Sequence, residues 1–247
     1  MPILKRPDAE IHYEIHGAGF PILLYAPGGL KSEASMWGGS SPAYPNGFPW
    51  MDPRKALIDK YTVIAMDQRN AGRSVADVKP DHGWHTFAAD HLALMDHLGF
   101  KKFHVMGGCI GGSYCFEAIE QAPDRVAAAV LQNPIGLWEN RDTWDAAIQG
   151  YSETVRGRDP SISEATIQSF GRNMFGSDFV FSVTRDFVKT CRTPLFLQPG
   201  SDKPHPAKTS EEIAALAPNL EVQKDWKGNI PDSIKRVRTF LEKNTPA

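Results

Sequence analysis

Residues 103–112 read FHVMGGCIGG, and the interpretation of this 247-residue chain starts from them. The first four have the short apolar pattern of a buried strand, and the residues from the end of the segment to Ala122 have a helical pattern. The glycines between the two predict a sharp turn, because a side chain at Gly107 or Gly111 would crowd the neighbouring strand and helix. We therefore expect a strand–turn–helix unit with Cys109 on the turn.

Short apolar runs of the same kind recur along the chain. They lie at residues 21–26, 61–66, 103–106, 126–131 and 194–197. Each run is bounded by turn residues, as expected of strands that are buried on both faces of a parallel sheet. Helical patterns at 87–98, 110–122 and after Pro231 separate or follow these runs. The alternation predicts an α/β fold with a doubly wound, mostly parallel sheet and right-handed crossovers.

Three further segments depart from this alternation. Polar residues alternate with Ile11, Tyr13 and Ile15, which predicts a half-exposed strand at an edge of the sheet. Residues 30–53 are rich in Gly, Pro, Ser and aromatic residues without a clear period, and such a long irregular loop is typical of a functional lip. Residues 137–190 have helical patterns and interrupt the strands. We expect them to form a small helical cap within a single domain of residues 1–247.

Composition and charge exclude several classes of protein. The net charge of −2 and the pI of about 6.4 provide no electrostatic footprint for nucleic acid or an anionic membrane. The chain opens without the apolar run of a signal peptide, and no apolar stretch approaches the roughly 20 residues of a membrane-spanning helix. The histidines, cysteines and carboxylates do not have metal-ligand spacing. We expect a cytoplasmic protein with no cofactor, metal, nucleic-acid partner or membrane partner. The sequence does not indicate its oligomeric state.

Cys109 is the candidate nucleophile. Most free cysteines are small buried apolar residues, but packing alone does not require four glycines around one thiol. The predicted turn also places Cys109 at the positive end of the following helix, which favours thiolate over thiol. Cys115, on that helix, and Cys191, just before a strand, are expected to be structural.

The segment 98–112 resembles the nucleophile elbow of α/β-hydrolase-fold enzymes, with cysteine in the position of the usual serine. Its Gly-x-Cys-x-Gly-Gly form is similar to that of dienelactone hydrolases. Three further segments match the family in order and spacing. YAPGG at residues 25–29 is similar to the oxyanion turn, with Pro in place of the usual His. DQRNAGRS at 67–74 is similar to the family's Asp-x-Arg-Gly-x-Gly-x-Ser turn. GSD at 200–202 is similar to the loop that carries the acid of the triad.

This resemblance implies an α/β-hydrolase fold and a set of site residues. Cys109 would be the nucleophile and Asp202 the acid of a catalytic triad. The backbone N–H groups of Gly29 and Ile110 would form the oxyanion hole, where each donor stabilises the transition state by roughly 3 kcal/mol. Gly28 would let the backbone approach the substrate closely.

The histidine of the triad is missing from its usual place. In the family it follows the last strand, here near residues 220–226, but this chain has Gly-Asn at 228–229 and no histidine beyond His205. Three interpretations follow. His205 acts as the base from the loop of the acid, or another histidine such as His85 serves, or no base exists. Without a base the acyl-enzyme would turn over slowly, or the protein would only bind its ligand.

The sequence thus favours a hydrolase or acyl-transferring enzyme that acts on an ester, thioester or lactone through Cys109. Trp37, Phe48 and Trp50 in the predicted lip indicate a small, partly apolar substrate, because such pockets are mostly apolar. Ordinary core packing is the other interpretation of these aromatic residues. The alternative function is a ligand-binding or sensing protein on a degenerate hydrolase scaffold. A third hypothesis is carbon–carbon bond cleavage or a lyase step on the same scaffold.

Overall fold

The computed structural model describes residues 2–40 and 44–246. Within them, one nine-stranded sheet has the order β1-β2-β4-β3-β6-β7-β8-β9, and β5 pairs with β2. The strands are β1 (Ile3–Arg6), β2 (Ala9–His16), β3 (Phe20–Tyr25), β4 (Tyr61–Met66), β5 (Val75–Ala76), β6 (Phe103–Gly108), β7 (Val126–Gln132), β8 (Leu195–Gln198) and β9 (Leu220–Val222). From β4 to β9 along the sheet, all neighbouring strands are parallel. This confirms the predicted doubly wound, mostly parallel sheet.

The strands predicted from apolar runs are present, because their side chains are buried on both faces of the sheet. All six residues of β6 are buried, for example. The position predicted for β2 is wrong, however. β2 pairs antiparallel with both β1 and β4, so β1 lies outside it at the edge. Strand β1 was not predicted from the sequence, because four residues are too few to show the two-residue periodicity of a strand.

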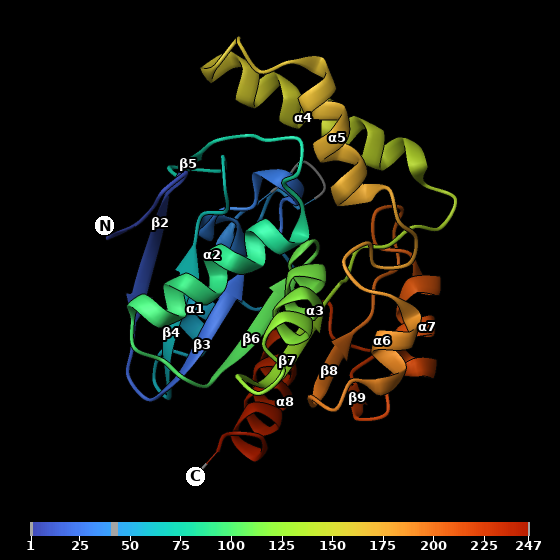
Figure 1. Ribbon diagram of the computed structural model, residues 1–247. Coiled ribbons are helices and arrows are strands. Elements are labelled where there is room, and N and C mark those ends of the chain that lie inside the picture. The colour runs from blue at the N-terminus through green and yellow to red at the C-terminus, as the bar shows by residue number, and fades with distance from the viewer. Residues whose placement is uncertain (1, 41–43, 247) are drawn as a thin grey trace.

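Helices cover both faces of the sheet (Figure 1). They are α1 (Pro53–Ala56), α2 (Trp84–His97), α3 (Gly111–Gln121), α4 (Arg141–Arg158), α5 (Glu164–Phe175), α6 (Arg185–Thr190), α7 (Ala207–Leu216) and α8 (Ile230–Lys243). The cores show which helix covers which face. Leu94 of α2 and Tyr114 of α3 belong to one core, while Leu57 beside α1 and Leu241 of α8 belong to the other. Helices α2 and α3 therefore cover one face of the sheet, and α1 and α8 cover the other.

Three helices occupy the segment between β7 and β8 that was predicted as a cap. Helices α4 and α5 project beyond the sheet, whereas α6 lies beside it next to α7 (Figure 1). Aromatic contacts attach α4 and α5 to the rest of the molecule. Trp144 of α4 packs against Phe175 and Phe181, and the Trp84 indole of α2 donates to the Met174 carbonyl at 2.7 Å. Apolar burial thus fixes these helices over the carboxyl ends of the strands.

The predicted lip, residues 30–53, contains short helical turns and no strand in its described part. They are the 3₁₀ turns η1 (Gly29–Lys31) and η2 (Ala34–Gly38) and the start of α1. Residues 41–43 of this segment lie outside the described residues. Farther along, the Gly228 N–H donates to the Pro49 carbonyl at 2.8 Å. This bond joins the lip to the loop between β9 and α8.

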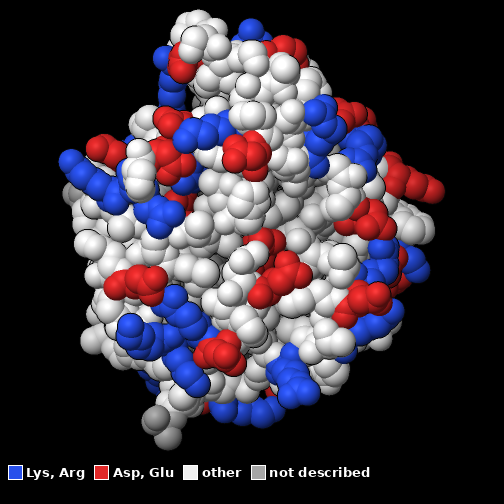
Figure 2. All heavy atoms as spheres, in the orientation of Figure 1, with Lys and Arg blue, Asp and Glu red and all other residues white. Residues whose placement is uncertain are grey.

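Positive and negative side chains are interspersed over the face shown in Figure 2. This agrees with the small net charge of −2. No helix in the described ranges is long and apolar enough to cross a membrane. No group of three or more metal-ligating side chains occurs among the described residues either. Binding to nucleic acid and cellular location stay predictions from the sequence.

Candidate active site

Cys109 lies on the turn between β6 and α3 with a left-handed backbone, φ 57°. A cysteine in this region of conformational space costs roughly 1–3 kcal/mol, so the surrounding structure must hold it there. Hydrogen bonds on both sides do so. The Cys109 N–H donates to the Gln132 carbonyl at 3.0 Å, and the Gly112 N–H donates to the Cys109 carbonyl at 3.1 Å. The thiol is presented, partly exposed, at the carboxyl end of the central strand.

The glycines around this turn are needed for the close approach of three backbone segments. A Cβ atom at Gly107 would lie 2.0 Å from the Gly111 carbonyl oxygen. A Cβ atom at Gly111 would lie 2.2 Å from the Tyr25 carbonyl oxygen of β3. Neither distance is possible for a real side chain, and the colliding atoms are backbone atoms that cannot rotate away. The predicted steric role of Gly107 and Gly111 is confirmed.

Replacing Gly111 by alanine is therefore expected to destabilise the protein by about 1–3 kcal/mol, the usual cost of overpacking. Gly150→Ala is a matched control, because Gly150 lies within α4 and a Cβ atom there would meet nothing within 4 Å. That variant should be about 0.5–1 kcal/mol more stable, since alanine favours helix more than glycine. Urea unfolding of both variants measures the difference. Equal stability of the two would contradict the steric argument.

Asp202 and His205 share one tight turn after β8. The backbone N–H of each donates to the carbonyl of the other, at 3.2 and 3.0 Å. The same turn brings the His205 Nδ1 to 2.5 Å from the Asp202 Oδ1. Gly200 is required beside them, because a Cβ atom there would lie 2.4 Å from the His205 carbonyl oxygen. A carboxylate and an imidazole three residues apart are thus locked together by local structure.

The imidazole of His205 interacts with the thiol of Cys109. Burial raises the pKa of Cys109, but the charge and hydrogen bonding of His205 outweigh it, and the net pKa of this thiol is lowered. Burial lowers the pKa of His205, but Cys109 and Asp202 together raise this pKa to about 9. The Nε2 atom makes no hydrogen bond of normal geometry to a described residue. Hydrogen bonds between catalytic groups are often long before substrate binds. The shifts favour a thiolate–imidazolium pair.

The carboxylate of Asp202 is itself stabilised in its charged form. Partial burial raises its pKa, but the hydrogen bond and charge of His205, together with the charge of Lys227, lower it below its ordinary value. The Lys227 Nζ lies 4.0 Å from the second carboxylate oxygen and 3.3 Å from the Ser201 hydroxyl. Lys227 was not predicted as a site residue. It could have been considered because it lies in the loop after β9, where the resemblance to the family leads one to expect the catalytic histidine.

Two backbone N–H groups hydrogen-bond the sulfur of Cys109. They belong to Gly28 and Ile110, and both lower the pKa of the thiol. The predicted role of the Gly29 and Ile110 N–H groups as an oxyanion hole stays a prediction. Gly28 and Gly29 both have a positive φ, 119° and 60°, at the start of the turn η1. A side chain at Gly28 would also lie 2.2 Å from the Met36 sulfur.

Comparison with known proteins identifies the family of this chain. The family described as alpha/beta hydrolase fold matches residues 21–239. The chain belongs to this family. Its curated relatives include proteins named as candidate carbamate hydrolases, RutD, from Azorhizobium caulinodans and Caulobacter vibrioides. They are 36% and 33% identical over 54% and 50% of this chain. The matches span 44% and 42% of those relatives, so the chain corresponds to less than half of their length.

Solved structures of low sequence identity share the alpha/beta hydrolase fold. An enol-lactonase from Burkholderia xenovorans LB400 superposes with a TM-score of 0.68 at 19% identity, covering 98% of this chain and all of that one. A meta-cleavage product hydrolase from Pseudomonas fluorescens IP01 superposes with a TM-score of 0.67 at 17% identity, covering 96% of each chain. At such identities the likeness establishes the fold alone.

The site differs from the usual alpha/beta hydrolase pattern in the source of its histidine. Asn229, in the loop where the family places that residue, caps α8 by accepting from the Asp232 N–H. His85, the other histidine considered from the sequence, is exposed and bonds the Thr86 hydroxyl at 3.3 Å. His205 is the imidazole that reaches Cys109.

The pKa values of the other two thiols are shifted in the opposite direction to that of Cys109. Burial raises the pKa of Cys115 on α3 well above its ordinary value. Burial also raises the pKa of Cys191, and hydrogen bonding at Thr193 offsets it only in part. Both therefore stay neutral thiols, as expected of structural cysteines.

The aromatic residues of the lip pack in two different places. Trp37 is buried in the core between the sheet and α8, against Gly108. Phe48 and Trp50 stack with ring centroids 4.4 Å apart, and Trp50 lies 6.1 Å from Trp226 in the loop after β9. Core packing thus accounts for Trp37. Contact of Phe48 and Trp50 with a substrate stays a prediction.

Proposed function

We propose that this protein is a hydrolase that acts on a small ester, thioester or lactone through Cys109. The observation that carries the proposal is the placement of Cys109 on the strained turn between β6 and α3, together with the Asp202–His205 pair, whose Oδ1 and Nδ1 lie 2.5 Å apart. The lowered pKa of Cys109 and the raised pKa of His205 support it. A thiolate beside an imidazolium is a ready nucleophile and a proton donor in one pair. Membership of the alpha/beta hydrolase fold family supports this function.

In the first step, the Cys109 thiolate would attack the carbonyl carbon and form a carbon–sulfur bond. The electron pair of the carbonyl moves onto its oxygen, where the N–H groups of Gly29 and Ile110 would stabilise the negative charge. The bond to the leaving oxygen or sulfur then breaks. That atom takes the proton from the His205 imidazolium, leaving a thioester on Cys109 and a neutral imidazole.

In the second step, a water molecule would attack the thioester. The neutral His205 removes a proton from this water, which therefore reaches the carbonyl as an activated nucleophile. Collapse of the tetrahedral intermediate releases the acid and restores the thiolate and the imidazolium. The hydrogen bond from Nδ1 to Asp202 keeps the imidazole in the orientation that both steps require.

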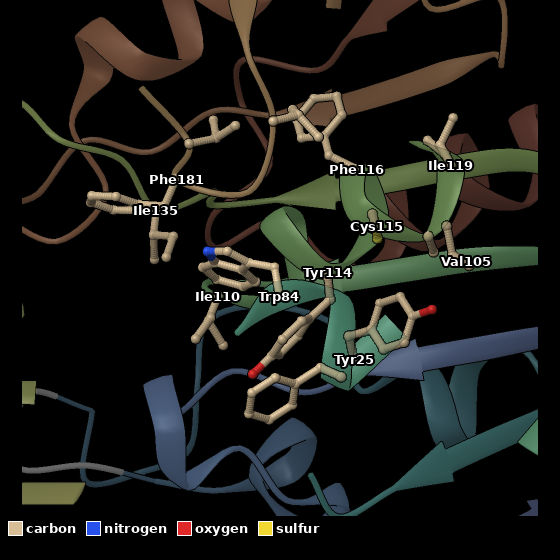
Figure 3. Packing of buried hydrophobic residues seen from close by; sticks show 14 of the residues in the cluster. Tyr25, Trp84, Val105, Ile110, Tyr114, Cys115, Phe116, Ile119, Ile135 and Phe181 are labelled. Carbon is tan, nitrogen blue, oxygen red and sulfur yellow. The ribbon is translucent and has the colours of Figure 1, made fainter. Parts of the chain in front are cut away.

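An apolar substrate fits the surroundings of Cys109. Trp84, Ile135 and Phe181 are buried and lie on the same side of the core as Ile110, the residue after Cys109 (Figure 3). The Ile135 N–H donates to the Cys109 carbonyl at 3.4 Å, which holds this wall beside the nucleophile. Curated relatives are named as candidate carbamate hydrolases, and a carbamate also offers a carbonyl carbon to the Cys109 thiolate. A carbamate therefore belongs with the esters in a substrate screen.

Incubation with p-nitrophenyl butyrate tests the proposal. We expect a burst of p-nitrophenolate, one equivalent per protein, and a mass increase of one butyryl group that peptide mapping places on Cys109. Steady release of p-nitrophenolate should follow. Absence of both the burst and the adduct would contradict the proposed hydrolase function. The ligand-binding alternative would then account for the site better.

A further inference from the structure

Lys227, in the loop between β9 and α8, faces the carboxylate of Asp202. Its Nζ lies 4.0 Å from the Asp202 Oδ2 and donates to the Ser201 hydroxyl at 3.3 Å. The other carboxylate oxygen, Oδ1, binds the Nδ1 and the backbone N–H of His205 at 2.5 and 3.2 Å. The two oxygens of Asp202 therefore have different partners, the ammonium group on one side and the imidazole on the other.

Hydrogen bonds and packing hold the loop of Lys227 in this place. The Trp226 indole N–H donates to the Pro199 carbonyl at 2.9 Å, and the Trp226 carbonyl accepts from the Ser233 hydroxyl of α8 at 3.0 Å. The Lys227 Nζ also lies 5.3 Å from the centre of the Trp226 ring, which is a cation–π contact. The Lys227 side chain is 28% exposed as a result, and its ammonium group is directed to Asp202.

Asp202 needs a second restraint because its carboxylate is open to solvent. Its side chain is 46% exposed, and the terminal torsion of an aspartate is broad, so the carboxylate can rotate away from His205 unless both oxygens are held. Lys203, the residue next to Asp202, does not supply the restraint, because its Nζ pairs with Asp142 of α4 at 2.5 Å. Lys227 supplies it.

We propose that Lys227 is a positioning residue of the active site. Its ammonium group holds the Oδ2 of Asp202, which keeps Oδ1 on the imidazole of His205 and that imidazole in one orientation. Lys227 acts only through Asp202 in this arrangement. The inference rests on the proposed function for its effect on turnover, whereas its effect on the Asp202–His205 hydrogen bond does not require hydrolysis.

A cavity beside Lys227 allows its charge to be removed and then supplied again. The cavity has a volume of about 470 Å³ and lies between the loop after β8, α7 and the loop after β9. Ser201, Ser210, Lys224 and Lys227 are among the residues that line it. Lys227→Ala would therefore add to an open space the volume of one propylammonium ion, which has the atoms that the substitution removes.

Lys227→Met is expected to lower kcat for p-nitrophenyl butyrate roughly 2- to 5-fold with little change in KM, the range of a partly exposed ion pair. Lys227→Arg keeps the charge and should retain most of the activity. Lys227→Ala should lose as much as Lys227→Met but recover with propylammonium. Lys227→Met should not recover, because methionine fills the space. Lys224→Met, on the wall of the same cavity, is the matched control and should keep the wild-type kcat.

Proton NMR tests the hydrogen bond without turnover. The Nδ1 proton of His205, in its short hydrogen bond to Asp202, should give a downfield resonance that His205→Gln removes. We expect Lys227→Met to broaden or remove this resonance through faster exchange with water, because Asp202 then leaves the imidazole more often. Lys227→Arg and Lys224→Met should keep it.

An unchanged kcat and an unchanged resonance in Lys227→Met would overturn the inference and leave the proposed hydrolase in place. A loss of activity that neither Lys227→Arg nor propylammonium restores would also overturn it, because the bulk of the side chain and not its charge would then be responsible. Loss of the resonance in Lys227→Met alone, with no acylation of Cys109 in the wild-type protein, would support the inference and contradict the proposed hydrolase.

Discussion

Cys109→Ala is expected to hydrolyse p-nitrophenyl butyrate at least about 1000-fold more slowly than the wild-type protein, because no thioester can form. Cys109→Ser should also be strongly impaired at neutral pH. The lowered pKa of Cys109 increases the fraction of thiolate present before substrate arrives, whereas a serine hydroxyl must lose its proton to His205 during the attack. Initial rates and the mass of the acylated peptide measure both effects.

Cys115→Ala is the control for these two variants. Cys115 follows on α3, is buried and has a raised pKa, so its thiol is inert and its replacement should leave the rate unchanged. A Cys109→Ala variant that hydrolyses the ester at nearly the wild-type rate would mean that another residue is the nucleophile. The site assignment would then be wrong.

His205→Ala is expected to reduce turnover by roughly two to four orders of magnitude, the usual range of general acid–base catalysis. It should also raise the pKa of Cys109, because burial of the thiol would no longer be offset by the imidazolium. The thiolate fraction at neutral pH would fall. The rate of iodoacetamide labelling at Cys109 should therefore drop, and its pH profile should move to higher pH.

The wild-type pH profile gives an independent check on His205. Hydrolysis should rise as pH increases through the lowered pKa of Cys109, since the thiolate is the nucleophile. It should decline as pH rises through about 9, where His205 loses the proton that the leaving group needs. His85→Ala, the exposed histidine on α2, is the control and should keep both the rate and the profile. An unchanged rate in His205→Ala would exclude it as the base.

The local parts of this fold could be predicted because their causes are local in the sequence. A strand buried on both faces is mostly apolar, and β6 and β7 are apolar apart from His104 and Gln132. The close approach of Gly111 to Tyr25 leaves room only for glycine, so the turn around Cys109 can be recognised from its glycines. The turn that joins Asp202 to His205 is also local, since the two are three residues apart. The edge strand β1 was not predicted, because four residues are too few to show the alternation of apolar and polar side chains that identifies a strand.

The fold could be predicted from the apolar runs and the glycines of the sequence, because steric and burial requirements act on neighbouring residues. The groups that surround Cys109 could not be predicted in the same way. That depends on how separate loops pack across the ends of the strands. His205, in the loop after β8, and Gly28, in the loop after β3, both act on the thiol of Cys109 after β6, although they are far apart in the sequence. Only tertiary packing sets such distances.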